Sequence, residues 1–191
     1  MGPSLPDICA GILVGGRGRR LGGVDKARLT NQGRSFVAIL VERLRSELVH
    51  LALLGRTDQK YDEVDCPLWP DAKPDSGPLG GLVTLLNNTP VDWVFLLACD
   101  MPSFDVSLLL ALADARTEAT DVVVPEHNGR LHCTAALYHR RILPLASGRL
   151  QSGGLSMREL VGALKAVHLP VTAALATTLA NVNRPGDHAP I

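Results

Sequence analysis

Apolar residues in this chain fall into short continuous runs, separated by longer segments with a single apolar face. The runs at 8–14, 49–54 and 93–98 are almost wholly apolar, as expected of strands buried on both faces of a parallel sheet. Between the first two runs, segment 36–48 repeats apolar residues at helical spacing, and Ser35 is a candidate helix N-cap. This alternation of strands and helices predicts an α/β fold.

The rest of the chain continues this pattern. We expect further helices at 79–88, 105–116, 139–146 and 155–164, and further strands at 64–68, 121–125, 131–137, 167–171 and 177–182. A hairpin turn at 126–130 and a polar loop at 149–154 separate some of these elements. Because no linker or repeat interrupts residues 1–191, we expect one domain, a Rossmann-like three-layer sandwich. Its sheet should be mostly parallel with one antiparallel strand, and ligands should bind at the carboxyl ends of the strands.

Composition and charge argue against several classes of protein. Nineteen basic residues balance nineteen acidic ones, so no basic face for nucleic acid is expected. No apolar run approaches the roughly 20 residues that cross a membrane, and the N-terminus lacks the basic segment of a signal peptide. The four cysteines form neither a CxxC motif nor a zinc-spaced pair. We therefore expect a cytoplasmic protein with no nucleic-acid or membrane partner.

The first apolar run ends in a glycine-rich, cationic segment at 15–26, with the sequence GGRGRRLGGVDK. Glycine lets backbone N–H groups approach a ligand closely, and Arg and Lys supply charge for anionic oxygens. These features are typical of a phosphate-binding loop. The spacing of the segment fits neither GxxxxGK[ST] nor GxGxxG, so it differs from both of these phosphate-binding motifs.

Asp100 follows the apolar run at 93–98, at the carboxyl end of a predicted strand. If this strand neighbours the first one, the carboxylate lies beside phosphates held by the glycine-rich segment. Mg²⁺ binds one or two carboxylates together with phosphate oxygens, so we predict that Asp100 holds Mg²⁺. A purely structural role in a turn or helix cap is the alternative for this residue.

Two weaker signals accompany Asp100. The loop at 69–81 is rich in Pro, Asp and Gly, and its Asp71 can accept hydrogen bonds from a base or a ribose. Near the end of the chain, Asn181 and Asn183 alternate, so on a strand both side chains would point to the same side.

Four motifs together resemble the molybdenum cofactor guanylyltransferase family. They are LVGGRGRRLGGVDKARL from residue 13, SGPLGG from residue 76, CDMP from residue 99 and NVNRP from residue 181. The resemblance runs over about residues 8–187 and implies a nucleotidyltransferase fold related to sugar-nucleotide pyrophosphorylases. It implies transfer of GMP from GTP to the terminal phosphate of molybdopterin that carries molybdenum, with release of pyrophosphate. It also implies Mg²⁺ as cofactor and molybdoenzyme-specific chaperones as further partners.

The resemblance also implies roles for individual residues. Asp100 and Lys26 would be catalytic together with Arg20, with Asp100 as the Mg²⁺ ligand and the two cations stabilising the pyrophosphate. The implied nucleotide-binding residues are Leu13, Val14, Gly15, Gly16, Lys26, Asp71 and Gly80. Asp71 would contact guanine or its ribose, and Lys26 would bind the triphosphate. Asn181 and Asn183 would bind the molybdopterin substrate.

The chain departs from the family pattern at two positions near the expected nucleotide. Val14 replaces the usual Ala and is expected to crowd the nucleotide, and Leu54 stands near a position that is often Asn. Two alternatives stay open for these reasons. One is a cytidylyl- or sugar-nucleotidyltransferase of the same fold, and the other is a weakly active partner that delivers molybdopterin to other enzymes.

Overall fold

The computed structural model describes residues 5–15, 26–56, 58, 60–71 and 73–182. These residues build an eight-stranded sheet in the order β10-β7-β9-β6-β1-β4-β5, with β8 paired to β7. Its strands are β1 (Ile8–Leu13), β4 (His50–Gly55), β5 (Leu68–Pro70), β6 (Trp93–Ala98), β7 (Val122–His127), β8 (Arg130–Leu131), β9 (Ala135–His139) and β10 (Ala166–Pro170). A separate two-stranded hairpin joins β2 (Thr30–Asn31) to β3 (Arg34–Ser35).

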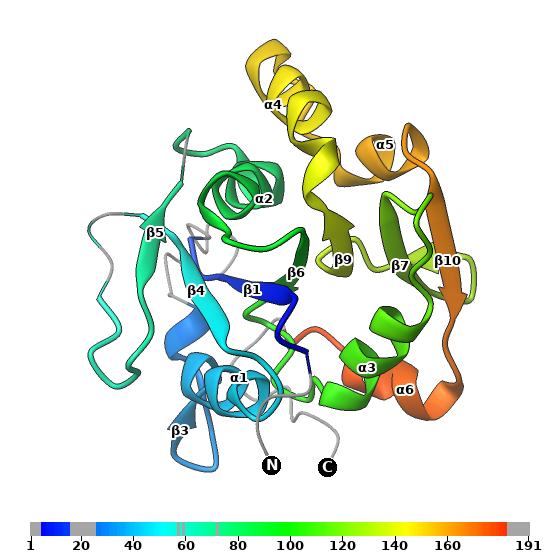
Figure 1. The fold of residues 1–191 in the computed structure, drawn as a ribbon. Coiled ribbons are helices and arrows are strands. Elements are labelled where there is room, and N and C mark those ends of the chain that lie inside the picture. The colour runs from blue at the N-terminus through cyan, green and yellow to red at the C-terminus, as the bar shows by residue number, and fades with distance from the viewer. Residues whose placement is uncertain (1–4, 16–25, 57, 59, 72, 183–191) are drawn as a thin grey trace.

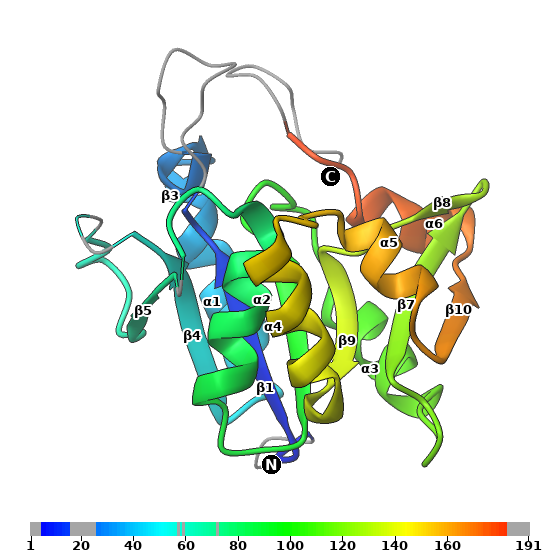
Figure 2. The ribbon, with the colours of Figure 1, turned by 90° about the horizontal axis from the view of Figure 1, so that it is seen from above.

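Helices cover both faces of the sheet, which gives three layers (Figure 1). The helices are α1 (Phe36–Arg45), α2 (Gly77–Asn88), α3 (Val106–Asp114), α4 (Leu143–Ser152), α5 (Met157–Gly162) and α6 (Ala173–Thr178), with short 3₁₀ turns at η2 (Lys26–Arg28) and η3 (Arg140–Ile142). On one face lie α2, α4 and α5, and on the other lie α1, α3 and α6. Figure 2 shows α2 and α4 side by side in front of the sheet.

The predicted fold class is confirmed. Strands β1, β4, β5 and β6 are parallel to one another, and β7 pairs with β10 in parallel. The antiparallel strand is β9, which lies between β6 and β7 and runs opposite to both. The two-residue strand β8 is a second antiparallel element, because it forms a hairpin with β7. The turn of that hairpin uses Asn128 and Gly129, which both have positive φ, as a tight hairpin requires.

The pleat of the sheet divides the core into two parts. Along β1, Ile8, Ala10 and Ile12 belong to the cluster that contains α1 and α3 side chains, whereas Cys9 and Leu13 pack on the side of α2. Successive side chains of a strand point to opposite faces, so the position of a residue in its strand decides which layer it touches. Residues just beyond a strand end continue this alternation, which matters for the site described below.

Three predicted elements were wrong. The strand expected at 64–68 is not formed, because β5 begins only at Leu68 and runs to Pro70. No strand forms at 177–182: helix α6 extends to Thr178, and residues 179–182 follow it without regular structure. Thr172 caps this helix by accepting a hydrogen bond from Leu175 N. The β-branched Thr177 and Thr178 fit this helix because their hydroxyls donate to carbonyl oxygens three residues earlier, each at 2.7 Å. The polar loop expected at 149–154 is largely helix, because α4 continues to Ser152 before it ends at a left-handed glycine.

Helix α2 approaches the sheet closely because small residues line the contact. A Cβ atom on Gly81 of α2 would overlap Leu13 Cδ2, and a Cβ on Gly11 of β1 would lie 2.5 Å from Leu54 Cδ1 and 2.8 Å from Leu85 Cδ2. Leu54 and Leu85 are fully buried, so neither has free space to move into. The glycines therefore set the depth at which α2 lies against β1 and β4.

We expect Gly11→Ala to lower the free energy of unfolding by about 1–3 kcal/mol, because the added methyl group overpacks a filled core. Gly148→Ala is the matched control. Gly148 lies in α4 with open space around its Cα, so the same change should raise stability by about 0.5–1 kcal/mol through helix propensity. Urea denaturation of both variants measures the difference, and equal effects would contradict the close packing.

Candidate active site

The carboxyl ends of β5, β4, β1 and β6 meet at one edge of the sheet and form the floor of a cleft of about 600 Å³. The cleft opens on the α2 face, because alternation along the strands places Leu13, Leu54, Ala98 and Asp100 on that side. The first residues of α2 and the loop before it form one wall. The described lining comprises Leu13, Val14, Gly15, Lys26, Leu54, Gly55, Arg56, Asp58, Pro70, Asp71, Pro74, Asp75, Gly77, Pro78, Ala98, Cys99, Asp100 and Thr134.

The end of β1 contributes its backbone to this cleft. Val14 N donates to Leu54 O at 2.8 Å, and Leu13 O accepts from Cys99 N at 3.3 Å, so the chain after β1 stays fixed between its two neighbours. The side chain of Val14 is only 1% exposed and packs in the core cluster of α1 and α3. The side chain of Val14 therefore packs on the side of α1 and α3, although Val14 also lines the cleft. That it crowds the nucleotide stays a prediction.

Leu54 lies on the floor of the cleft and is fully buried. Its side chain fills the space that Gly11 and Gly81 leave between β4 and α2. A polar side chain here would be buried against leucines, so this position contributes apolar packing to the floor.

Asp71 stands at the end of β5, where its backbone N–H donates to Gly55 O at 2.8 Å. Its carboxylate lies against the end of β1: a Cβ atom on Gly15 would be 3.1 Å from Asp71 Oδ2 and 3.0 Å from Gly55 Cα. Gly15 is therefore required for this close approach. Within the described residues, Asp71 Oδ1 is buried and has no hydrogen-bond partner. Burial accordingly raises the pKa of the Asp71 carboxyl to about 6.

Lys26 and Asp100 form an ion pair in the cleft, with 2.9 Å between Lys26 Nζ and Asp100 Oδ2. Lys26 comes from η2 at the end of the glycine-rich segment, and Asp100 follows β6, so residues 74 apart in sequence meet here. The second oxygen, Asp100 Oδ1, is buried and lacks a hydrogen-bond partner among the described residues. A buried carboxylate oxygen without a donor is costly, and a bound cation would satisfy it.

The turn after Asp100 is anchored from two distant parts of the chain. Arg43 of α1 donates from Nη1 to Pro102 O at 2.7 Å and to Phe104 O at 2.5 Å. From the C-terminal side, Val182 N donates to Asp100 O at 2.8 Å. The structure therefore brings Asn181, the neighbour of Val182, to the same edge as Asp100, although Asn181 follows a helix and not the strand that we predicted.

At the N-terminus of α2, Ser76 and Gly80 pack closely against each other. Ser76 is buried, and its hydroxyl donates to Lys73 O instead of capping the helix. Gly80 lies directly beneath Ser76, where a Cβ atom would collide with the Ser76 hydroxyl. Gly80 thus does not line the cleft, whereas Gly77 and Pro78 do.

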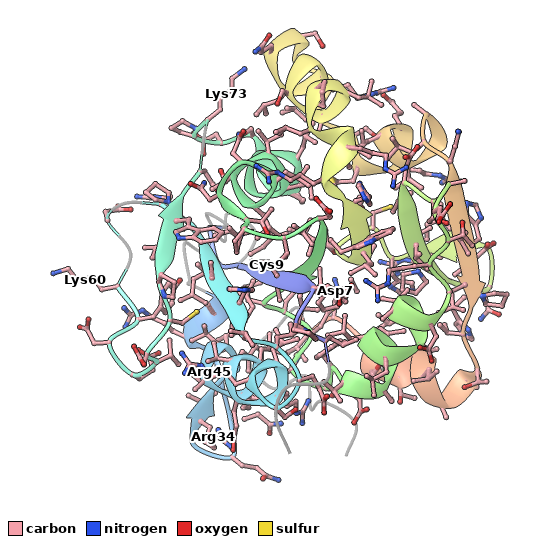
Figure 3. All side chains as sticks on the ribbon, viewed as in Figure 1. Asp7, Cys9, Arg34, Arg45, Lys60 and Lys73 are labelled. Carbon is pink, nitrogen blue, oxygen red and sulfur yellow. The ribbon has the colours of Figure 1, made fainter. Side chains whose placement is uncertain are left out.

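Lys73 attaches the loop before α2 to a neighbouring helix. Its Nζ donates to Leu150 O of α4 at 3.3 Å, and Figure 3 shows Lys73 beside the end of α4. The loop that carries Asp71 and Asp75 is therefore tied to the helical layer as well as to the sheet.

Of the predicted site residues, the structure brings Leu13, Val14, Gly15, Lys26, Asp71 and Asp100 together in the cleft. Gly16, Arg20 and Asn183 lie outside the described residues. Sequence reasoning missed the lining residues Arg56, Asp58 and Thr134. Arg56 and Asp58 form an ion pair just beyond β4, and the strand-end rule that identified Asp100 could have found Arg56.

Thr134 gave no comparable signal. It precedes β9, and a sequence does not reveal that this strand is antiparallel and lies next to β6.

In the part of the chain that the structure describes, no helix is long and apolar enough to cross a membrane.

We expect Asp71→Asn to stabilise the protein at neutral pH. The folded pKa of about 6 lies above the ordinary value of 3.8, so folding favours the protonated carboxyl and wild-type stability falls as the pH rises from about 4 to above 6. The neutral amide removes this penalty. After allowance for the partial exposure of Asp71, the gain at pH 7.5 should be about 1 kcal/mol.

Urea denaturation of wild type and Asp71→Asn at pH 4 and pH 7.5 tests this expectation. The difference should be much smaller at pH 4, where the carboxyl is protonated in the folded wild type and partly protonated in the unfolded chain. Asp62→Asn, which changes an exposed carboxylate, is the control. A variant that is less stable than wild type at pH 7.5 would contradict the desolvation of Asp71.

Comparisons with known proteins show the family of this chain. The profile of the family described as MobA-like NTP transferase domain matches residues 10–167. A molybdenum cofactor guanylyltransferase of Aliivibrio salmonicida is 32% identical over 143 residues, 74% of either chain. Another guanylyltransferase with this name, from Vibrio cholerae, is 30% identical over 74% of this chain and 70% of its own length.

Solved structures show the same fold. Molybdopterin-guanine dinucleotide biosynthesis protein A of Archaeoglobus fulgidus superimposes with a TM-score of 0.80 at 19% identity over 93% of each chain. The 2-C-methyl-D-erythritol 4-phosphate cytidylyltransferase of Thermus thermophilus gives a TM-score of 0.70 at 16% identity, over 98% of this chain and 95% of its own. At these identities the likeness concerns the fold alone. The family match and the curated relatives confirm the resemblance found in the sequence: the chain belongs to the MobA-like NTP transferases, a family of nucleotidyltransferases.

Proposed function

We propose that this protein transfers GMP from GTP to the terminal phosphate of molybdenum-bearing molybdopterin and releases pyrophosphate. The observation that carries the proposal is the cleft in which the Lys26–Asp100 pair faces the end of β1 and Asp71. This arrangement occurs in a chain whose curated relatives are named molybdenum cofactor guanylyltransferases.

The reaction needs no protein nucleophile, because the acceptor phosphate is already anionic at neutral pH. One of its oxygens forms a bond to the α-phosphorus of GTP while the bond from that phosphorus to the bridging oxygen of the β-phosphate breaks. The electron pair of the broken bond leaves with pyrophosphate. Catalysis then consists of positioning the two phosphates in line and stabilising the charge that develops on the leaving group.

The charges of the cleft support a cation requirement. Its described lining carries four carboxylates, Asp58, Asp71, Asp75 and Asp100, and two cationic side chains, Lys26 and Arg56. A triphosphate entering this lining is repelled unless further positive charge binds with it. We expect the arginines of segment 16–25, outside the described residues, to supply part of that charge, and a metal ion to supply the rest.

Asp100 is the residue that fits Mg²⁺. Its buried Oδ1 has no hydrogen-bond partner among the described residues, and a hard carboxylate oxygen is the kind of ligand that Mg²⁺ takes together with phosphate oxygens. When bound there, Mg²⁺ would neutralise phosphate charge. Lys26, adjacent to Asp100, would hold the triphosphate and stabilise the departing pyrophosphate.

Asp71 is placed to select guanine. In its ionised form, a carboxylate only accepts hydrogen bonds, and the guanine edge offers two adjacent donors, N1–H and the 2-amino group. The pyrimidine edge of cytosine offers one donor beside an acceptor, which would face the carboxylate unfavourably. The unpartnered Asp71 Oδ1 suits such a pair of incoming donors.

A nucleotide panel tests the proposal. We expect the protein to bind GTP about 10-fold or more tightly than CTP or UTP when Mg²⁺ is present, and to release pyrophosphate from GTP only when loaded molybdopterin is added. Asp71→Asn should reduce the preference for GTP. Tighter binding of CTP would support the cytidylyl alternative, and binding without product would support a delivery partner.

Asp100→Asn should reduce transfer by about 100-fold or more at saturating Mg²⁺, because it removes the charge that holds the metal ion and keeps the shape of the side chain. Isothermal titration of GTP with and without Mg²⁺ should show that the variant loses the effect of the metal on nucleotide binding. Asp114→Asn, at the exposed end of α3, is the matched control. Wild-type transfer by Asp100→Asn would refute the metal assignment.

A further inference from the structure

A rigid turn borders the cleft on the side of Asp100 that lies away from Asp71. It comprises His132, Cys133, Thr134 and Ala135, and it leads from the β7–β8 hairpin into β9. Ala135 N donates to His132 O at 2.9 Å and closes the turn, while His132 N donates to Pro125 O at 3.0 Å. Ala98 N of β6 donates to Thr134 O at 2.8 Å. The turn is therefore held to both neighbouring strands.

A buried tyrosine also forms a hydrogen bond to this turn. Tyr138 of β9 is fully buried, and its hydroxyl donates to Cys133 O at 2.7 Å. A buried Tyr hydroxyl normally requires such a partner. Four hydrogen bonds thus fix four residues, which is more order than a simple strand connection needs.

Thr134 is the member of this turn that lines the cleft. The hydrogen bond from Ala98 N to Thr134 O places Thr134 beside the end of β6, and Asp100 follows Ala98 by two residues. Within the described part of the chain, the Thr134 hydroxyl has no hydrogen-bond partner, although it is half-buried. The turn therefore presents one neutral donor at the end of the cleft next to Asp100.

The order of the strands along this edge suggests what binds there. From β5 to β9 the cleft passes Asp71, the end of β1, Asp100 and then Thr134, with neighbouring strands about 4.8 Å apart. Suppose that the base lies at Asp71 and the reacting phosphates lie near Asp100. The start of β9 then lies on the side of the α-phosphorus from which an in-line attack must come. A phosphate-bearing acceptor is the ligand that fits this position.

We propose that the turn at His132–Ala135 is the docking site of the acceptor phosphate, with Thr134 Oγ1 donating a hydrogen bond to it. This inference rests on the proposed nucleotidyl transfer and names the acceptor side of the same cleft. A hydroxyl suits that place because it binds a phosphate oxygen without adding a charge that would compete for Asp100.

Thr134→Val is the test, because it removes the hydroxyl and keeps the shape of the side chain. We expect kcat/KM for the acceptor to fall on the order of 10- to 100-fold, as for a lost hydrogen bond to a charged group. The dissociation constant for GTP with Mg²⁺ should stay within about twofold of wild type, because the base and triphosphate contacts are untouched. Thr134→Ser, which restores the hydroxyl, should recover most of the acceptor kcat/KM.

Thr30→Val is the matched control, because Thr30 is exposed on the β2–β3 hairpin. This substitution should leave the acceptor kcat/KM and the dissociation constant for GTP unchanged. An unchanged acceptor kcat/KM in Thr134→Val would overturn the inference while the proposed function stands. The inference would also be overturned if Thr134→Val weakened GTP binding by as large a factor as it lowered kcat/KM for the acceptor. That result would assign Thr134 to the nucleotide. If the wild type neither binds GTP nor releases pyrophosphate, the proposed function fails and this inference falls with it.

Tyr138→Phe tests whether the hydrogen bond to Cys133 O positions Thr134. We expect a smaller loss of acceptor kcat/KM than in Thr134→Val, with unchanged GTP binding. In the double variant, Tyr138→Phe should cause no further loss, because the hydroxyl that it positions is already absent. Additive losses would show that Tyr138 acts independently of Thr134 and would remove it from the proposal.

Discussion

The cleft depends above all on how closely α2 lies against β1 and β4. Gly11 and Gly81 remove the side chains that would hold the helix away, and Leu54 fills the space that remains. This contact places the start of α2 and the loop carrying Asp71 over the strand ends. Leu54 belongs to this packed contact, which accounts for an apolar residue near a position that is often Asn in the family pattern.

At the rim of the cleft, two carboxylates are partly buried at a cost in stability. Asp71 and Asp100 each have one buried carboxylate oxygen with no hydrogen-bond partner among the described residues. For Asp71, burial raises the pKa to about 6. For Asp100, Lys26 offsets part of the cost through their ion pair. Groups that folding leaves unsatisfied are the ones that a ligand can satisfy, so both carboxylates are expected to be worth more to binding than to folding.

Sequence patterns predicted those parts of the structure that depend on neighbouring residues along the chain. Continuous apolar runs identified β1, β4 and β6, and the rule that ligands bind at strand ends identified Asp100. Two kinds of information were missing. The sequence does not state the order of strands in a sheet, so the insertion of antiparallel β9 between β6 and β7, and with it the place of Thr134, could not be read from it. Nor does it state where a strand will end, and therefore how far the alternation continues that places the Val14 side chain in the core.

Two anionic substrates have to meet in a cleft whose described lining has more carboxylates than cations. Cationic side chains placed at every contact would pair with Asp71 and Asp100 and would occupy the buried oxygens that lack a hydrogen-bond partner among the described residues. The arrangement seen here separates these demands along the sheet edge. Asp71 lies at the end of β5, the Lys26–Asp100 ion pair lies at the centre, and the neutral Thr134 precedes β9. We propose that these positions serve the base, the reacting phosphates and the acceptor in that order. In this arrangement, positive charge is needed only where the phosphates react.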